Sequence, residues 1–174
     1  PSSGHSVTVS KIVTGDVTAL AITATEIAAD AVTVPKIAQT IPCCRVSGIS
    51  GGSQTLTTGV AAVLSFNLDN YDSKQSDTDQ MWTSADRPTI FTREAGFFFI
   101  FGHVTFASND VGNRQVQVQR AGGVALGTAR VPAVAGGDVT IVAFVASGNL
   151  GAGTSITVLA LQNSGGDLAV TDAM

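Results

Sequence analysis

A β-branched residue recurs every five positions through the first forty residues, and this period strongly limits how the chain can fold. Between Ser6 and Thr40, the second position of every five-residue block is Val or Ile. These residues are Val7, Ile12, Val17, Ile22, Ile27, Val32 and Ile37. A strand repeats every two residues and a helix every 3.6, so neither alone gives a period of five. The repeat therefore predicts a series of short units.

Threonines within the repeat indicate what each unit is. Thr8, Thr18, Thr23 and Thr33 each follow a Val or Ile and stand four residues before an Ile. A Thr N-cap between hydrophobic residues at N′ and N4 forms a hydrophobic staple, in which those two residues are five apart. The period thus predicts brief helical turns, and stacked five-residue coils of a β-helix are the alternative. Because such short turns need neighbouring chains, the seven Val and Ile residues are predicted to lie at an oligomer interface.

The character of the sequence changes at Ile41–Pro42. Residues 1–41 contain no aromatic residue, whereas every Phe, the Trp and the Tyr follow Pro42. We therefore expect two regions, a repetitive oligomeric stalk or attachment segment at 1–41 and a head domain at 42–174. Only 13% of the residues are charged, about half the usual fraction, which indicates that much surface is hidden in a core or against other copies.

Charge and hydropathy exclude two classes of function. The net charge is −4 and the sequence has no Lys/Arg cluster, which argues against nucleic-acid binding. No apolar run reaches the length of a membrane span. The sequence also has no nucleophile motif around a Ser, and its acidic residues concentrate in one loop, so we expect no enzymatic activity and no cofactor.

The head shows the alternation and the turns of β-structure. Alternating or apolar segments lie between Gly-rich turns, and no long helix is predicted. The expected strands are 61–68, 96–107, 114–121, 124–131, 138–147 and 154–163. Many short strands with Gly-rich turns favour an antiparallel sandwich or jelly roll.

Two of these strands, 96–107 and 138–147, are apolar on both faces. A β-sandwich has one inner face per sheet, so the outer face of such a strand needs a cover. A second copy of the chain is the simplest cover, and loops of the same chain are the alternative. We therefore predict a homo-oligomer whose interface in the head includes Phe97, Phe99, Phe101, Val142 and Phe144.

Short motifs in the head occur in a familiar order. They are Met81-Trp82-Thr83-Ser84, Glu94-Ala95-Gly96-Phe97, Ala107-Ser108-Asn109 with Gly112 and Arg114, and Gln162-Asn163-Ser164-Gly165. This order resembles the trimeric C1q/TNF-like jelly roll, and in particular the version found as heads on bacteriophage fibres and spikes. Residues 31–40 (AVTVPKIAQT) resemble the KIA-type repeats of phage fibre stalks. The resemblance implies a homotrimeric jelly-roll head on a short stalk.

The function implied by the resemblance is that of a virion appendage: a capsid spike, head fibre or tail fibre. It would decorate the particle and bind host-surface glycan weakly, gaining avidity from repetition. The implied partners are its own copies, other capsid or tail proteins reached through the N-terminal region, and the glycan. The implied location is the virion surface, after assembly in the host cytoplasm. A decoration protein without receptor binding and a bacterial extracellular C1q-like recognition domain are the alternatives.

Two groups of head residues are candidates for contact with a glycan. Trp82 offers a large rigid surface on which a sugar can stack. Gln115, Gln117 and Gln119 form an uncharged outward row that both donates and accepts hydrogen bonds. The competing interpretations are a structural Trp and the solvated face of an outer strand.

The loop 69–82 is a candidate cation site. It carries Asp69, Asp72, Asp77 and Asp79, and carboxylate oxygens are ligands that calcium prefers. The loop lacks the Gly and the distal Glu of a helix-flanked calcium loop, and a solvated acidic loop is the competing interpretation.

Cys43 and Cys44 are adjacent, so they cannot readily pair with each other. We expect two small buried residues, and a disulfide to another subunit is the alternative. His103 lies in an apolar strand and is expected to pack in the core or at an interface.

Overall fold

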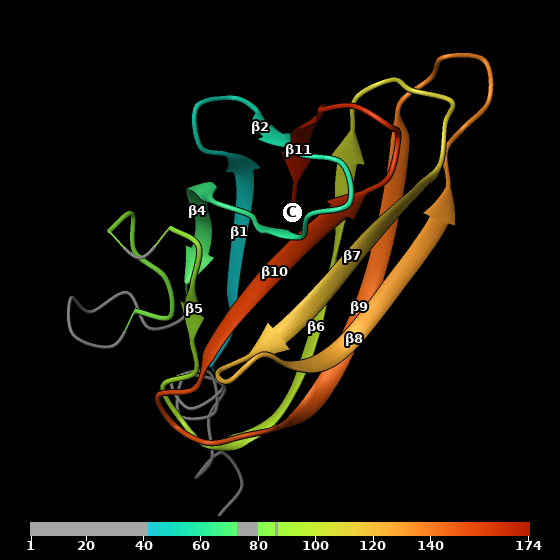
Figure 1. The fold of residues 1–174 in the computed structure, drawn as a ribbon. Helices are drawn as coiled ribbons and strands as arrows, with labels where there is room; N and C mark the ends of the chain where they lie inside the picture. Colours follow the sequence, from blue (N-terminus) through green and yellow to red (C-terminus); the bar gives the residue numbers. More distant parts are fainter. Residues whose placement is uncertain (1–41, 73–79, 86) are drawn as a thin grey trace, which may run out of the picture. The chain divides into compact units, whose positions relative to one another are not determined.

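The computed structural model describes residues 42–72, 80–85 and 87–174 (Figure 1). These residues form eleven strands: β1 (Cys44–Ile49), β2 (Gln54–Leu56), β3 (Ala62–Val63), β4 (Phe66–Asp72), β5 (Ile90–Phe91), β6 (Gly96–Phe106), β7 (Asn113–Arg120), β8 (Val124–Pro132), β9 (Thr140–Leu150), β10 (Ser155–Gln162) and β11 (Leu168–Ala173). Every pairing between them is antiparallel. The described residues contain no helix long and apolar enough to span a membrane.

Two sheets enclose the core. One has the strand order β2-β11-β6-β9, and the other has the order β3-β10-β7-β8, with β5 also paired to β10. The chain crosses between the sheets, since β6 and β7 lie in different sheets, as do β8 and β9 and also β10 and β11. This is the jelly-roll arrangement, and the fold class predicted for the head is confirmed. The stalk prediction falls on residues outside those the structure describes.

The core lies between the two sheets because alternate side chains of each strand face inward. Val116 and Val118 of β7 are buried against Val104 and Phe106 of β6, together with Val158 of β10. Burial of each such side chain is worth about 1.5–3 kcal/mol. The half-buried strand predicted at 114–121 is thus confirmed, with its valines inward and its glutamines outward.

A third, two-stranded sheet consists of β1 and β4. Val46, Ile49 and Phe66 of this β1–β4 ribbon belong to the same hydrophobic core. Besides its pairing with β4, strand β1 contacts β11. Figure 1 shows the ribbon beside the end of β11.

The strand predicted at 61–68 is divided into β3 and β4. Leu64, between them, donates its backbone N–H to the carbonyl of Val158 at 2.8 Å, and Ser65 N donates to Gln54 Oε1 at 3.1 Å. The chain leaves the edge of one sheet here and enters the ribbon, so its pairing partner changes within the predicted strand. The other five predicted strands correspond to β6–β10 with ends shifted by up to three residues.

Arg114 holds the turn between β6 and β7. Its guanidinium is fully buried and donates to the carbonyl oxygens of Asn109 and Val111, each at 2.9 Å, and of Asn113 at 3.1 Å. Gly112 has a φ of +79°, and a Cβ there would lie 2.8 Å from the carbonyl carbon of Asn163. These two motif residues therefore build the turn between β6 and β7.

Candidate functional site

The outer surface of β6 and β9 carries a patch of exposed apolar side chains. The strands pair along their whole length, with Phe101 opposite Val145. The exposed fractions are 57% for Phe97, 72% for Phe99, 75% for Phe101, 57% for Ile141 and 71% for Val145. The rings of Phe97 and Phe99 meet edge to face with centroids 5.2 Å apart. We call these five residues the aromatic face; its phenylalanines point outward as the sequence predicted.

Val142 and Phe144 were also predicted for the oligomer interface, and their placement corrects that prediction. Their exposed fractions are 0% and 6%, and both belong to the core of the single chain. Because side chains alternate along a strand, inward-facing Val142 and Phe144 leave Ile141 and Val145 facing outward. The residues that β9 contributes to the outer face are therefore Ile141 and Val145.

A contact between His103 and Asp172 borders the aromatic face. His103 follows Phe101 on the same side of β6, and its Nε2 lies 3.4 Å from Asp172 Oδ2 on β11. The His103 side chain is one-third exposed, so it does not lie in the core of the single chain, and its place at an interface stays a prediction. The contact gives this edge of the apolar surface a polar boundary.

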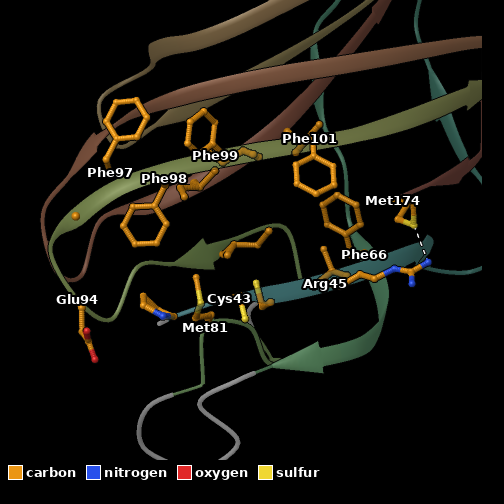
Figure 2. A pocket seen from close by; sticks show the side chains of 18 of the residues that line it. Cys43, Arg45, Phe66, Met81, Glu94, Phe97, Phe98, Phe99, Phe101 and Met174 are labelled. Carbon is orange, nitrogen blue, oxygen red and sulfur yellow. Dashed lines mark hydrogen bonds between the residues drawn. The ribbon is translucent and has the colours of Figure 1, made fainter. Parts of the chain in front are cut away.

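A cavity of about 770 Å³ opens between β1 and the first half of β6. Figure 2 shows Phe97, Phe99 and Phe101 along the strand above it, with Cys43, Arg45, Phe66 and Met81 on the other side. Phe98, Ile100, Phe144, Ile156 and Val158 complete an apolar lining. Its charged lining residues are Arg45, whose Nη2 donates to Met174 Sδ at 2.8 Å, and Glu94.

Both cysteines line this cavity, and no disulfide joins them. Cys43 is exposed, so the expectation that both would be buried is wrong for Cys43. Burial raises the pKa of the Cys44 thiol to about 12, with smaller contributions from the charges of Asp72 and Asp69. A thiol with this pKa is protonated near neutral pH and is a poor nucleophile or metal ligand.

Trp82 is a structural residue. Its exposed fraction is 3%, and its indole Nε1–H donates to the Arg87 carbonyl at 3.2 Å. A ring buried in the core cannot stack on a sugar, so the predicted ligand contact of Trp82 is wrong. The competing interpretation, a structural Trp, is the correct one.

Two carboxylates of the segment 69–82 accept hydrogen bonds from backbone N–H groups. Asp72 is 2% exposed, and its Oδ2 accepts the N–H groups of Met81 at 2.6 Å and of Trp82 at 3.4 Å. Asp69 Oδ1 accepts the N–H of Tyr71 at 3.0 Å. The pKa of Asp69 is raised by partial burial and then by the charge of Asp72.

The predicted calcium site therefore divides into two pairs. Asp72 points into the protein to cap backbone amides, which is a structural role, while Asp77 and Asp79 lie outside the described residues. Within the described part of the chain, no three His, Cys, Asp or Glu side chains gather as a metal site.

The glutamine row lies on the outer surface of the second sheet. Gln115, Gln117 and Gln119 are half-buried on the outward side of β7. Gln119 Nε2 donates to Gln117 Oε1 at 2.7 Å, and Gln117 Nε2 lies 3.3 Å from Thr128 Oγ1. The row is pre-ordered by these bonds and still presents amide groups to solvent. Contact with a glycan stays a prediction.

No family model and no curated protein matches the sequence. Among solved structures, the globular domain of zebrafish complement 1qA is similar, with 14% identity over 77% of this chain and 96% of that chain and a TM-score of 0.49. Eiger TNF from S. frugiperda has 9% identity over 75% of this chain and 88% of that chain, with a TM-score of 0.48. Murine APRIL has 14% identity over 74% of this chain and 98% of that chain, with a TM-score of 0.44. Likeness at this level identifies no ligand, partner or oligomeric state.

Proposed function

We propose that this chain is a bacteriophage virion appendage, a capsid spike, head fibre or tail fibre, whose β head assembles with two further copies. In this proposal the trimer decorates the particle surface after assembly in the host cytoplasm. The N-terminal region attaches to other virion proteins, and the head binds host-surface glycan weakly. The role is one of binding and assembly, without a catalytic step.

The observation that carries the self-association is the aromatic face. Soluble monomers rarely expose contiguous apolar patches of this kind, and such patches mark interaction surfaces. Burial of one exposed Phe is worth about 1.5–3 kcal/mol, so three phenylalanines per copy offer several kcal/mol towards assembly. Motif order in the head and the KIA-type repeats support the phage origin of the chain.

The glutamine row supports the glycan part of the proposal. Its amides are uncharged, donate and accept hydrogen bonds, and lie on the opposite sheet from the aromatic face, so a trimer built through that face leaves them open. Because amides already bonded to one another must exchange partners, each single contact is expected to be weak. Repetition over a particle then supplies avidity.

The internal hydrogen bonds of the row also favour a second candidate function, a decoration protein without receptor binding. Gln119 and Gln117 are already partnered by each other and by Thr128, so a purely structural outer strand accounts for the same geometry.

A glycan array with the full chain separates the two functions. We expect binding to host-type polysaccharides that falls at least tenfold in a Gln115→Ala/Gln117→Ala variant. Thr55→Ala, an exposed strand change away from the row, is the matched control and should bind normally. No binding on any polysaccharide, together with normal adsorption of particles that lack the protein, would favour the decoration role. Immunogold labelling of intact particles tests the virion location itself.

A further inference from the structure

The sheet that carries the glutamine row is positively charged, although the chain as a whole is acidic. Its strands, β3, β5, β7, β8 and β10, contain three arginines and no Asp, Glu or Lys. The carboxylates in the other described strands are those of Asp69, Asp72 and Asp172, in β4 and β11. The net charge of the chain is −4, so this sheet has the charge opposite to that of the whole chain.

Arg130 lies beside the glutamine row on the outer face. It is paired with Gln115 across β7 and β8, and side chains directly opposite each other in an antiparallel pair lie on the same face. Arg130 is exposed, whereas its neighbours Ala129 and Val131 pack against the core. Among the described residues, no carboxylate forms an ion pair with Arg130. Its guanidinium is therefore available to a ligand.

The other two arginines of the sheet face away from the row. Arg114 is fully buried and donates to carbonyl oxygens of the turn before β7. Arg120, at the end of β7, is paired with Ile156, which belongs to the core. Because residues directly opposite each other share a face, Arg120 lies on the inner side of the sheet, although it is exposed. The outward-facing cation of this sheet is therefore Arg130.

The hydrogen bonds of the row leave donors beside Arg130. Gln119 Nε2 donates to Gln117 Oε1 at 2.7 Å, and Gln117 Nε2 donates to Thr128 Oγ1 at 3.3 Å. A hydroxyl that accepts a bond in this way keeps its own proton for donation. Thr128 is exposed and stands two positions before Arg130 on β8, so the two side chains lie on one face. A hydroxyl donor next to a guanidinium, which only donates, favours an anionic acceptor.

The other side of the row is apolar. Strands β10, β7 and β8 lie side by side in that order (Figure 1), and β10 places Leu159 opposite Gln117 and Leu161 opposite Gln115. Both leucines are half-buried. The outer face thus changes across three strands from apolar side chains to amides and then to a cation. A uronic acid has the same sequence of groups, because its ring combines an apolar C–H face, hydroxyls and a carboxylate.

We propose that the outer face of β10, β7 and β8 binds an acidic glycan through a carboxylate-bearing sugar. The Arg130 guanidinium pairs with the carboxylate, and a planar guanidinium matches the two carboxylate oxygens. Thr128 and Gln115 donate to oxygen atoms of the same sugar, and Leu159 contacts its C–H face. This inference rests on the proposed glycan binding and names the class of glycan and two residues, Thr128 and Arg130, outside the glutamine row.

The test is an NMR titration of the isotope-labelled full chain with trisaccharides of galacturonic acid and of glucuronic acid. Their methyl esters, which keep the ring and lose the charge, are the matched control ligands. At least one acid should bind about tenfold or more tightly than its ester and shift the amides of Gln115, Thr128 and Arg130. Arg130→Ala should weaken that binding about tenfold, whereas Arg120→Ala, which removes the same charge from the inner side, should leave it within about twofold.

Four results would overturn the inference. Equal binding of acids and esters would exclude a role for the charge. Equal losses in Arg130→Ala and Arg120→Ala would indicate attraction by overall charge, without a site. Neutral glycans that bind as well as the acids and are lost in Gln115→Ala/Gln117→Ala would overturn the acidic preference and leave the proposed glycan binding intact. Absence of binding to the acids and to every neutral glycan would overturn both, so the two failures are distinguishable.

Discussion

Removal of the Asp72 carboxylate should destabilise the head measurably, although this residue lies in what reads as a solvated acidic loop. Asp72 is the last residue of β4, and its carboxylate accepts hydrogen bonds from the backbone N–H groups of Met81 and Trp82. It therefore joins the end of β4 to residues 81–82. Asp72→Ala leaves two buried amides without this acceptor.

The magnitude follows from the two bonds. A hydrogen bond to a charged group contributes about 1.5–3 kcal/mol. The 2.6 Å bond to Met81 N counts fully, and the 3.4 Å bond to Trp82 N counts little because it is long. We expect a loss of about 2–3 kcal/mol for Asp72→Ala, and about 1 kcal/mol for Asp72→Asn, which keeps a neutral acceptor oxygen.

Urea unfolding followed by the fluorescence of Trp82, the single Trp of the chain, measures this loss. All variants are compared at one protein concentration, because self-association couples stability to concentration. Asp138→Ala, which removes an exposed carboxylate, should stay within about 0.5 kcal/mol of the wild type. A loss of that small size for Asp72→Ala would refute the structural role of this carboxylate.

Three further predictions concern Cys44, Gly102 and calcium. The pKa of Cys44 is about 12 in the folded protein against 9.0 for an ordinary thiol, so the folded state holds this proton more tightly than the unfolded state. The free energy of unfolding should therefore fall as the pH rises from 9 towards 12. Urea titrations at a series of pH values measure this fall, and Cys44→Ala should make it smaller. A Cβ at Gly102 would overlap the Met174 carbonyl, so Gly102→Ala should lower the stability of the head by about 1–3 kcal/mol. Gly96→Ala is the control and should cost much less, because the atom nearest to a Cβ at Gly96 lies 3.8 Å away. Calorimetry of the two variants measures the difference in stability. Millimolar calcium should not raise the melting temperature, since Asp72 is committed to backbone amides; a rise of several degrees would contradict that assignment.

Strand positions could be predicted because they depend on local alternation. In β7, valines alternate with glutamines, and the structure buries the valines. The short strands β2 and β5 could not be predicted, because two or three residues carry no usable period and pair only where a longer strand offers an edge.

Which of two apolar faces points outward could not be read from the sequence. In β9, Val142 and Phe144 alternate with Ile141 and Val145, and both sets are apolar. Which set is buried is decided only when β9 pairs with β6 in a fixed register and the second sheet covers one side of that pair. The burial of Trp82 could not be predicted either, because this side chain packs into the core that the two sheets form together, and its sequence neighbours do not show this.

The cavity could not be predicted either, because its walls meet only in the folded chain. Arg45 and Met174 are 129 positions apart and touch across it.

Light scattering after size-exclusion chromatography tests the central claim, that the aromatic face drives self-association, most directly. At micromolar concentration we predict a mass of about three times the 17.6 kDa chain. Phe99→Glu, which places a charge on the aromatic face, should lower that mass. Val111→Glu, an equal charge at another exposed apolar residue, should leave it unchanged. A wild-type chain that stays monomeric, or a trimer that tolerates Phe99→Glu, would contradict the account.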